Sequence, residues 1–232
     1  MSTIAGNLQA VEATIETACR AAGRARSTVQ LLAVSKTFPA EAVLEVAETG
    51  QRAFGENYLQ EGIDKIAAVA KARPDLMLEW HFIGPIQSNK TRAIAEHFAW
   101  VHSVDRLKIA QRLSEQRPPE LPPLNICIQV NVSGEASKSG CSPEDLPALA
   151  QAISVLPNLK LRGLMAIPEP TDDRDEQNAS FAAVSTLQAQ LGLPLDTLSM
   201  GMSHDLEAAI AQGATWVRIG TALFGARNYG QP

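Results

Sequence analysis

The sequence predicts one α/β domain, a single (β/α)8 TIM barrel over residues 1–232 with an extra N-terminal helix. Short apolar runs alternate with helical segments along the chain, which is typical of a parallel sheet covered by helices. A length of 232 residues is ordinary for one such barrel, and 45% hydrophobic residues can fill its core. A doubly wound open sheet is the alternative, but it rarely needs eight such regular units.

The extra helix is expected over residues 7–23, because apolar residues recur at helical spacing from Leu8 to Ala18 and Gly23 suits a C-terminal cap. The strands are apolar runs bounded by residues that favour turns. They are expected at 29–35, 52–55, 78–83, 100–104, 124–132, 159–167, 197–200 and 216–219. The helices that follow are expected at 40–48, 58–72, 90–97, 105–115 with Asp105 as cap, 143–156 opened by Pro143, 175–191 after a polar loop at 169–174, and 205–212. The proline-rich segment 117–123 resembles a linker but is too short to separate two domains.

Composition and charge exclude several classes of function. A formal net charge of -5 argues against nucleic-acid and acidic-membrane partners. The N-terminus lacks the pattern of a secretory signal, and no apolar run approaches a membrane span. Cys19, Cys127 and Cys141 are widely spaced without a CxxC pattern, as expected for reduced thiols. We therefore expect a cytoplasmic protein without a disulfide framework or a metal site.

A lysine follows the first predicted strand. Residues 31–34 are apolar, Ser35 and Lys36 follow, and Pro39 ends the segment. A lysine at the end of a buried strand is costly unless it is paired or used in chemistry. Burial lowers the pKa of a lysine from about 10.4 and favours the neutral amine, which attacks aldehydes. A side chain that extends into solvent is the alternative.

Small residues gather in the loops after the seventh and eighth predicted strands. Gly201 and Ser203 lie in the first loop, and Gly220 and Thr221 lie in the second. Barrel enzymes often bind phosphate at these two loops, where glycine lets backbone N–H groups approach an anion. The alternative is helix capping, with Ser203 as an N-cap.

A lysine after strand one and a phosphate site after strands seven and eight predict a phosphorylated aldehyde held as a Schiff base. Pyridoxal 5′-phosphate carries both groups. Arg218 beside its pyridine nitrogen would keep that nitrogen unprotonated, which makes the ring a poorer electron sink than one paired with a carboxylate. A structural ion pair is the alternative for Arg218.

Six spaced motifs resemble the YggS/PROSC-type pyridoxal 5′-phosphate homeostasis protein family from end to end. They are Leu-Leu-Ala-Val-Ser-Lys-Thr (31–37), Phe-Gly-Glu-Asn-Tyr (54–58), His-Phe-Ile-Gly-Pro-Ile-Gln-Ser-Asn-Lys (81–90), Arg-Gly-Leu-Met-Ala-Ile-Pro (162–168), Leu-Ser-Met-Gly-Met-Ser (198–203) and Val-Arg-Ile-Gly-Thr-Ala-Leu-Phe-Gly-Ala-Arg (217–227).

The resemblance implies a protein of intracellular pyridoxal phosphate homeostasis whose barrel resembles the fold-type-III barrel of alanine racemase. Lys36 would form the Schiff base and Arg218 would face the pyridine nitrogen. The implied cofactor-binding residues are Lys36, Asn57, Met165, Ser203, Arg218, Gly220 and Thr221: Ser203, Gly220 and Thr221 hold the phosphate, and Asn57 and Met165 line the ring. We expect no metal, no catalytic turnover, a monomer or weak homodimer, and apo-enzymes as partners that could receive the cofactor.

Four further residues have two interpretations each. His204 stands where the family usually has an acidic residue, and we expect it to face solvent in the first turn of a helix, with contact to the phosphate as the alternative. His81 is expected to be a hydrogen-bonded structural imidazole, with a general base as the alternative. Lys90 is expected to be a solvated charge and Lys138 a free surface lysine, with a second cofactor site as the alternative.

Two enzyme classes remain as alternatives. A fold-type-III racemase or decarboxylase would share the lysine and the arginine, but nine residues follow Leu223, so we expect no β domain to supply a second base. The tyrosines are Tyr58 and Tyr229. A lysine-dependent aldolase would need a lysine on strand six, and Lys160 starts that strand at the wrong end.

Overall fold

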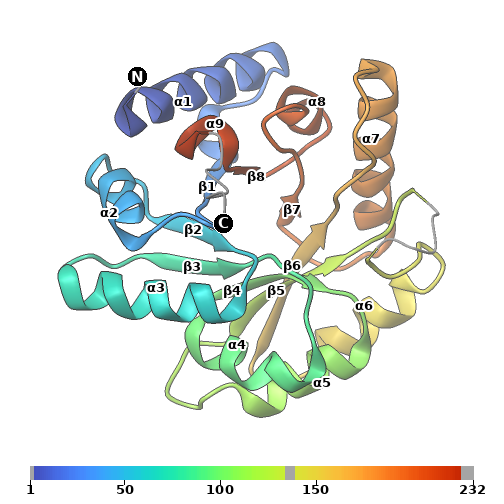
Figure 1. Ribbon diagram of the computed structural model, residues 1–232. Helices are drawn as coiled ribbons and strands as arrows, with labels where there is room; N and C mark the ends of the chain where they lie inside the picture. Colours follow the sequence, from blue (N-terminus) through green and yellow to red (C-terminus); the bar gives the residue numbers. More distant parts are fainter. Residues whose placement is uncertain (1–2, 134–138, 226–232) are drawn as a thin grey trace, which may run out of the picture.

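The computed structural model describes residues 3–133 and 139–225, and its eight parallel strands close into the predicted barrel. The strand order follows the chain from β1 to β8, and β8 pairs with β1 (Figure 1). The strands are β1 Gln30–Val34, β2 Ala53–Glu56, β3 Glu79–Phe82, β4 Trp100–Val104, β5 Leu124–Gln129, β6 Leu159–Met165, β7 Thr197–Ser199 and β8 Trp216–Ile219. The prediction of a TIM barrel is therefore confirmed.

The helices form an outer ring around the strands (Figure 1). They are α1 Ile4–Ala21, α2 Ala40–Glu48, α3 Leu59–Ala72, α4 Thr91–His97, α5 Leu107–Gln116, α6 Leu146–Ser154, α7 Arg174–Gln190, α8 Leu206–Ala211 and α9 Thr221–Phe224, with short 3-10 turns η1 Arg26–Thr28 and η2 Ser88–Lys90. The extra helix α1 packs on α8 and α9. In the described part of the chain, no helix is long and apolar enough to cross a membrane.

Two predicted helix starts are wrong. Asp105 does not cap α5, because its carboxylate accepts a hydrogen bond from Arg106 instead, at 2.7 Å. Pro143 does not open α6, which begins at Leu146. The Ser142 hydroxyl donates to the Asp145 carboxylate at 2.8 Å and accepts from the Asp145 N–H at 3.1 Å, and this local turn delays the helix.

Several strands are shorter than the apolar runs predicted. The expected β5 and β6 extend to residues 132 and 167, but the strands end at Gln129 and Met165. The extra apolar residues belong to loops at the carboxyl face of the barrel. Hydrophobic pattern indicates burial, and Val130, Val132 and Ala166 are buried or partly buried although the strand ladder has ended, whereas Ile167 is exposed.

The core has two layers. Most buried apolar residues lie between the sheet and the helices. Inside the barrel are two smaller apolar clusters, one around Leu32 and Ile83 and one of Trp100, Cys127 and Met165. All three cysteines are buried and free, and burial raises the thiol pKa of Cys141 to about 11.

Candidate functional site

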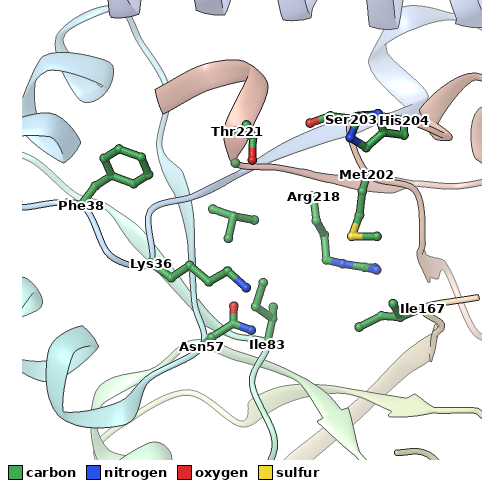
Figure 2. A pocket seen from close by; sticks show the side chains of 12 residues that line it. Lys36, Phe38, Asn57, Ile83, Ile167, Met202, Ser203, His204, Arg218 and Thr221 are labelled. Atoms are coloured by element: carbon green, nitrogen blue, oxygen red, sulfur yellow. The ribbon is translucent and has the colours of Figure 1, made fainter. Parts of the chain in front are cut away.

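A cavity of about 200 Å³ opens at the carboxyl end of the barrel strands. It brings together every predicted site residue except Met165. In Figure 2, Lys36 and Asn57 lie on one side, Arg218 and Ile167 on the other, and Thr221, Ser203 and His204 above them. Its lining consists of Val34, Lys36, Phe38, Asn57, Ile83, Ile167, Met202, Ser203, His204, Arg218, Gly220 and Thr221.

The closure of the barrel brings the lysine loop beside the last strand. Ala33 of β1 pairs with Ile219 of β8, so Lys36 and Gly220 both follow this pair by a few residues. Gly220 lies against the backbone of Val34, where a Cβ atom would stand 3.2 Å from the Val34 carbonyl oxygen. The first motif (31–37) and the last motif (217–227) therefore lie side by side in the cavity wall.

A buried cluster behind Lys36 holds the loop that carries it. The ammonium of Lys65 in α3 donates to the Ser35 carbonyl oxygen at 2.7 Å, to Glu56 Oε1 at 2.6 Å and to Glu61 Oε1 at 3.0 Å. Glu61 Oε1 also accepts from the N–H of Thr37 at 2.5 Å. Thr37 has a φ of 69°, a conformation that a β-branched residue adopts only when its surroundings enforce it. Both neighbours of Lys36 are therefore tied to this cluster.

The charges of Lys65 and Glu56 are shielded from water, whereas the Glu61 side chain is partly exposed. The Lys65 and Glu56 side chains are 4% and 0% exposed. Burial raises the pKa of the Glu56 carboxyl above its ordinary value, and the charge of Lys65 opposes this shift. The Ser35 hydroxyl also donates to Glu56 Oε1, at 2.6 Å. A buried pair of this kind is strongly destabilising to break, because the remaining charge is left without compensation.

Asn57 is held from behind by a glycine. A Cβ atom at Gly84 would stand 2.1 Å from the carbonyl oxygen of Asn57, so only glycine allows this approach. The side-chain Oδ1 of Asn57 is buried and has no hydrogen-bond donor among the described residues. Buried acceptors are normally paired, and a polar ligand in the adjoining cavity could supply the missing donor.

The guanidinium of Arg218 is buried with polar but uncharged groups as its direct partners. Nη1 donates to the Ser199 carbonyl oxygen at 2.5 Å and to Ser199 Oγ at 3.0 Å, and Nη2 donates to the Ala166 carbonyl oxygen at 2.9 Å. Burial lowers the pKa of Arg218 to about 10, so the group remains a cation at neutral pH. It places a fixed positive charge in the wall of the cavity.

Ser203, Gly220 and Thr221 line the cavity from the loops after β7 and β8, and Gly201 shapes the first of these loops without lining the cavity. Gly201 has a φ of 96°, and a Cβ atom there would stand 2.6 Å from Cβ of Ala209, so the turn requires glycine. Ser203 is not the N-cap of α8, since Asp205 occupies that position and accepts from the Met202 N–H at 2.6 Å. The Ser203 side chain is thus not used as a helix cap.

Met165 and His204 do not have the positions predicted for them. Met165 is fully buried in the interior cluster with Trp100 and Cys127, whereas Ile167 lines the cavity. His204 is exposed, but it precedes α8 and lines the cavity mouth, so the expectation of a first-turn residue is wrong.

The remaining lysines lie apart from the cavity or outside the described residues. Lys90 is exposed at the end of η2. Lys160 is the second residue of β6, at the opposite end of the barrel from the cavity. Lys138 lies outside the described residues. Within those residues, no group of three or more His, Cys, Asp or Glu side chains could hold a metal ion.

His81 is a hydrogen-bonded structural imidazole. It is fully buried and both ring nitrogens have partners, Glu79 and His102. Five residues at or near the site were not predicted from the sequence: His102, Lys65 and the cavity-lining Phe38, Ile167 and Met202. The alternation of side chains along β4 indicates that His102 faces the barrel interior, but no local sequence pattern indicates which polar group it contacts there.

A closed barrel with a lysine after β1, an arginine on β8 and hydroxyl residues at the adjoining loops defines a barrel of the alanine racemase N-terminal type. The family model described as "Alanine racemase, N-terminal domain" matches residues 6–228. An alanine racemase from Corynebacterium glutamicum shares the fold at a TM-score of 0.68 and 17% identity, over 97% of this chain and 64% of that chain.

Much closer relatives define the family. The chain is 71% identical to a "Pyridoxal phosphate homeostasis protein" from Pseudomonas aeruginosa, over 100% of this chain and 99% of the relative, and 54% identical to one from Escherichia coli K12, over 99% of each. PipY of Synechococcus elongatus, solved with PLP bound, has a TM-score of 0.82 and 40% identity, over 96% of this chain and 100% of that chain. The chain belongs to the pyridoxal phosphate homeostasis protein family.

Proposed function

We propose that this chain binds pyridoxal 5′-phosphate in the cavity, holds it through Lys36 and releases it to apo-enzymes without turning over amino acids. The observation that carries the proposal is the placement of an amine, a buried guanidinium and a hydroxyl-lined loop pair around one cavity of about 200 Å³. Pyridoxal phosphate presents an aldehyde, a pyridine nitrogen and a phosphate. Each of these groups has a chemical counterpart in the cavity wall.

The residues present fit that ligand. Lys36 would supply the amine for a Schiff base, in which the aldehyde carbon and the amine nitrogen join and water leaves. Arg218 would donate to the ring nitrogen, since a guanidinium is a donor and not an acceptor. Ser203, Thr221 and the backbone at Gly220 would hold the phosphate. The buried Oδ1 of Asn57 has no donor among the described residues, and the hydroxyl group on the pyridine ring is the group of this ligand that would donate to it.

The lining does not favour proton chemistry on an amino acid. Abstraction of an α-proton on both faces needs two placed bases, and Lys36 can serve one face only. Tyr58 is 54% exposed beside Asn57 and is not among the lining residues, and Tyr229 lies outside the described residues. A guanidinium at the pyridine nitrogen also weakens the ring as an electron sink. These features support a carrier over a racemase or decarboxylase.

The protein loaded with pyridoxal phosphate is therefore expected not to turn over L-alanine, L-serine or L-lysine. The measurement is α-proton exchange in deuterated buffer by NMR, together with the enantiomer composition of each amino acid. Slow exchange without net product agrees with a carrier. Racemisation or decarboxylation at about 1 s⁻¹ or faster, which is the ordinary range of enzymes, would establish the racemase or decarboxylase alternative instead.

Phosphate binding should be separable from binding of the ring. Ser203→Ala combined with Thr221→Val removes two hydroxyl donors, each contributing about 0.5–1.5 kcal/mol, or up to about 3 kcal/mol toward a charged acceptor. We expect the double variant to bind pyridoxal phosphate at least about tenfold more weakly and to bind unphosphorylated pyridoxal as the parent does. Calorimetry with both ligands measures this. Equal losses for the two ligands would mean that these residues shape the loops and do not contact phosphate.

A further inference from the structure

A line of hydrogen bonds crosses the barrel interior from the amino-terminal face to Arg218. Glu79 Oε1 lies 2.9 Å from His81 Nε2, and His81 Nδ1 lies 2.9 Å from His102 Nε2. His102 Nδ1 lies 2.7 Å from Ser199 Oγ, which accepts from Arg218 Nη1 at 3.0 Å. The members come from β3, β4, β7 and β8, on opposite walls of the barrel.

The two ends of this line determine its direction. A carboxylate accepts only, so His81 Nε2 must carry a hydrogen, and a guanidinium donates only, so Ser199 Oγ must accept from Arg218. With both imidazoles neutral, one arrangement satisfies every contact. His102 donates from Nε2 to His81 Nδ1, and the Ser199 hydroxyl donates to His102 Nδ1. Every donor then points from Arg218 toward Glu79.

The imidazoles are held in the neutral form and in fixed orientations. Both rings are fully buried, and burial lowers the pKa of His81 and lowers that of His102 further. The His81 ring stacks on Trp100, with centroids 5.3 Å apart and planes at 4°, and lies 4.8 Å from the ring of Trp216. Barrel interiors are usually filled with branched apolar residues. Hydrogen-bonded polar side chains such as His81, His102 and Ser199 are therefore unusual in the interior of a barrel.

The far end of the line reaches solvent. The Glu79 side chain is 45% exposed and lines a pocket of about 400 Å³ at the amino-terminal face, together with Trp216, Arg26 and Arg52. The hydrogen bond from His81 lowers the pKa of Glu79, so the carboxylate is charged at neutral pH. Hydrogen bonds in a chain polarise one another inside a protein. The line thus connects an exposed anion to a buried cation that has uncharged direct partners.

We propose that Glu79, His81, His102 and Ser199 are positioning residues for Arg218, and that they fix the direction in which its guanidinium faces the ligand ring. The proposal deepens the proposed function and rests on it. Because Ser199 commits its hydrogen to His102, its lone pairs face Arg218 and hold Nη1. Arg218 itself lines the cavity (Figure 2), and none of its three hydrogen bonds to Ser199 and Ala166 uses Nε–H, which is therefore available to a ligand. The positions of the hydrogens on His81, His102 and Ser199 are in this way coupled to the orientation of Arg218 at the ligand site.

Two conservative variants interrupt the line at different points. Ser199→Ala removes the hydroxyl link, and Ser199→Thr restores it. Glu79→Gln replaces an acceptor-only group by one that also donates, so the line can reverse and place the Ser199 hydrogen against Arg218. Glu96→Gln is the matched control, since Glu96 is an exposed carboxylate that lines a second surface pocket to which Glu79 also contributes, separate from the pocket with Trp216.

The first measurement is made on the protein without ligand. Nitrogen-15 NMR of the histidine side chains is expected to show hydrogen on Nε2 of both His81 and His102 in the parent protein, the Glu96→Gln protein and the Ser199→Ala protein. Glu79→Gln is expected to produce forms with hydrogen on Nδ1. If both rings in the parent carry hydrogen on Nδ1, the proposed direction is wrong.

The second measurement uses pyridoxal phosphate labelled with nitrogen-15 in the ring. Ser199→Ala and Glu79→Gln are expected to shift the ring-nitrogen resonance, and Ser199→Ala to weaken binding of pyridoxal phosphate and of pyridoxal alike, each by about tenfold. Ser199→Thr and Glu96→Gln should match the parent. Unchanged resonance and affinity, even with a lower melting temperature, would reduce the line to a structural role. If the parent binds no pyridoxal phosphate, the proposed function fails, while the histidine spectra still test the line itself.

Discussion

The Lys36→Ala protein is expected to carry no pyridoxyl group after borohydride reduction in the presence of pyridoxal phosphate, whereas the parent carries it on Lys36. Lys36 is the lysine that lines the cavity in the described chain, and a Schiff base needs a primary amine. The parent should also gain absorbance near the violet edge when pyridoxal phosphate is added, and the variant should not. Peptide mapping by mass spectrometry identifies the labelled residue.

Two controls separate chemistry from folding in this experiment. Lys36→Arg keeps a positive charge but cannot form a Schiff base, so it should bind the ligand only reversibly. Lys90→Ala removes an exposed lysine and should label as the parent does. Circular dichroism should show both Lys36 variants folded, because Lys36 is only half-buried at the cavity wall. Label on another residue with Lys36 unmodified would overturn the assignment, and label on Lys138 in addition would indicate a second site.

Lys65→Met is expected to cost about 3–5 kcal/mol in the free energy of unfolding, the largest stability effect of any single change proposed here. The substitution leaves Glu56 as a buried carboxylate without its cation and removes the donor to the Ser35 carbonyl oxygen. Urea unfolding measures the loss. Because Glu61 also accepts from Thr37, the loop around Lys36 should loosen, and the folded variant should bind pyridoxal phosphate more weakly.

Neutralising the partner tests the cause of that loss. The double variant Lys65→Met with Glu56→Gln buries no charge at this pair and should recover a large part of the stability. The deficit of Lys65→Met alone should shrink as the pH falls toward 5. Burial already raises the pKa of Glu56 in the parent, and Lys65→Met removes the charge that opposes this rise, so the stability of the variant is present at low pH and is lost as the pH rises through the folded pKa. A deficit independent of pH, with no recovery in the double variant, would instead indicate lost packing.

The barrel and most of its site could be predicted because the signals are local. Runs such as Leu31 to Val34, followed by a proline and a helical period, define a strand and its helix without knowledge of the neighbours. Parallel closure then requires that Lys36, Asn57, Ser203 and Thr221 share one face, and the cavity brings these residues together.

Predictions at the ends of elements failed where local pattern does not determine geometry. Met165 and Ile167 both belong to an apolar run, but β6 ends at Met165. Met165 therefore packs inside the barrel, and Ile167, in the loop beyond the strand, lines the cavity. The start of α6 was missed for a similar reason, since hydrogen bonds between Ser142 and Asp145 compete with the helix.

The sequence by itself determined the fold class, the family and the chemical groups of the site, because periodicity, turn residues and motif order are written along the chain. Only the tertiary structure decided which buried polar groups meet. His102 and Ser199 are 97 residues apart and lie on β4 and β7, and Lys65 reaches Ser35 across 30 residues. Their pairing depends on barrel closure and strand register, which bring inward-facing side chains from separate strands into hydrogen-bond distance. Desolvation in that interior then makes each unpaired donor or acceptor costly, so the folded arrangement is the one in which Glu79, the two histidines, Ser199 and Arg218 are satisfied together.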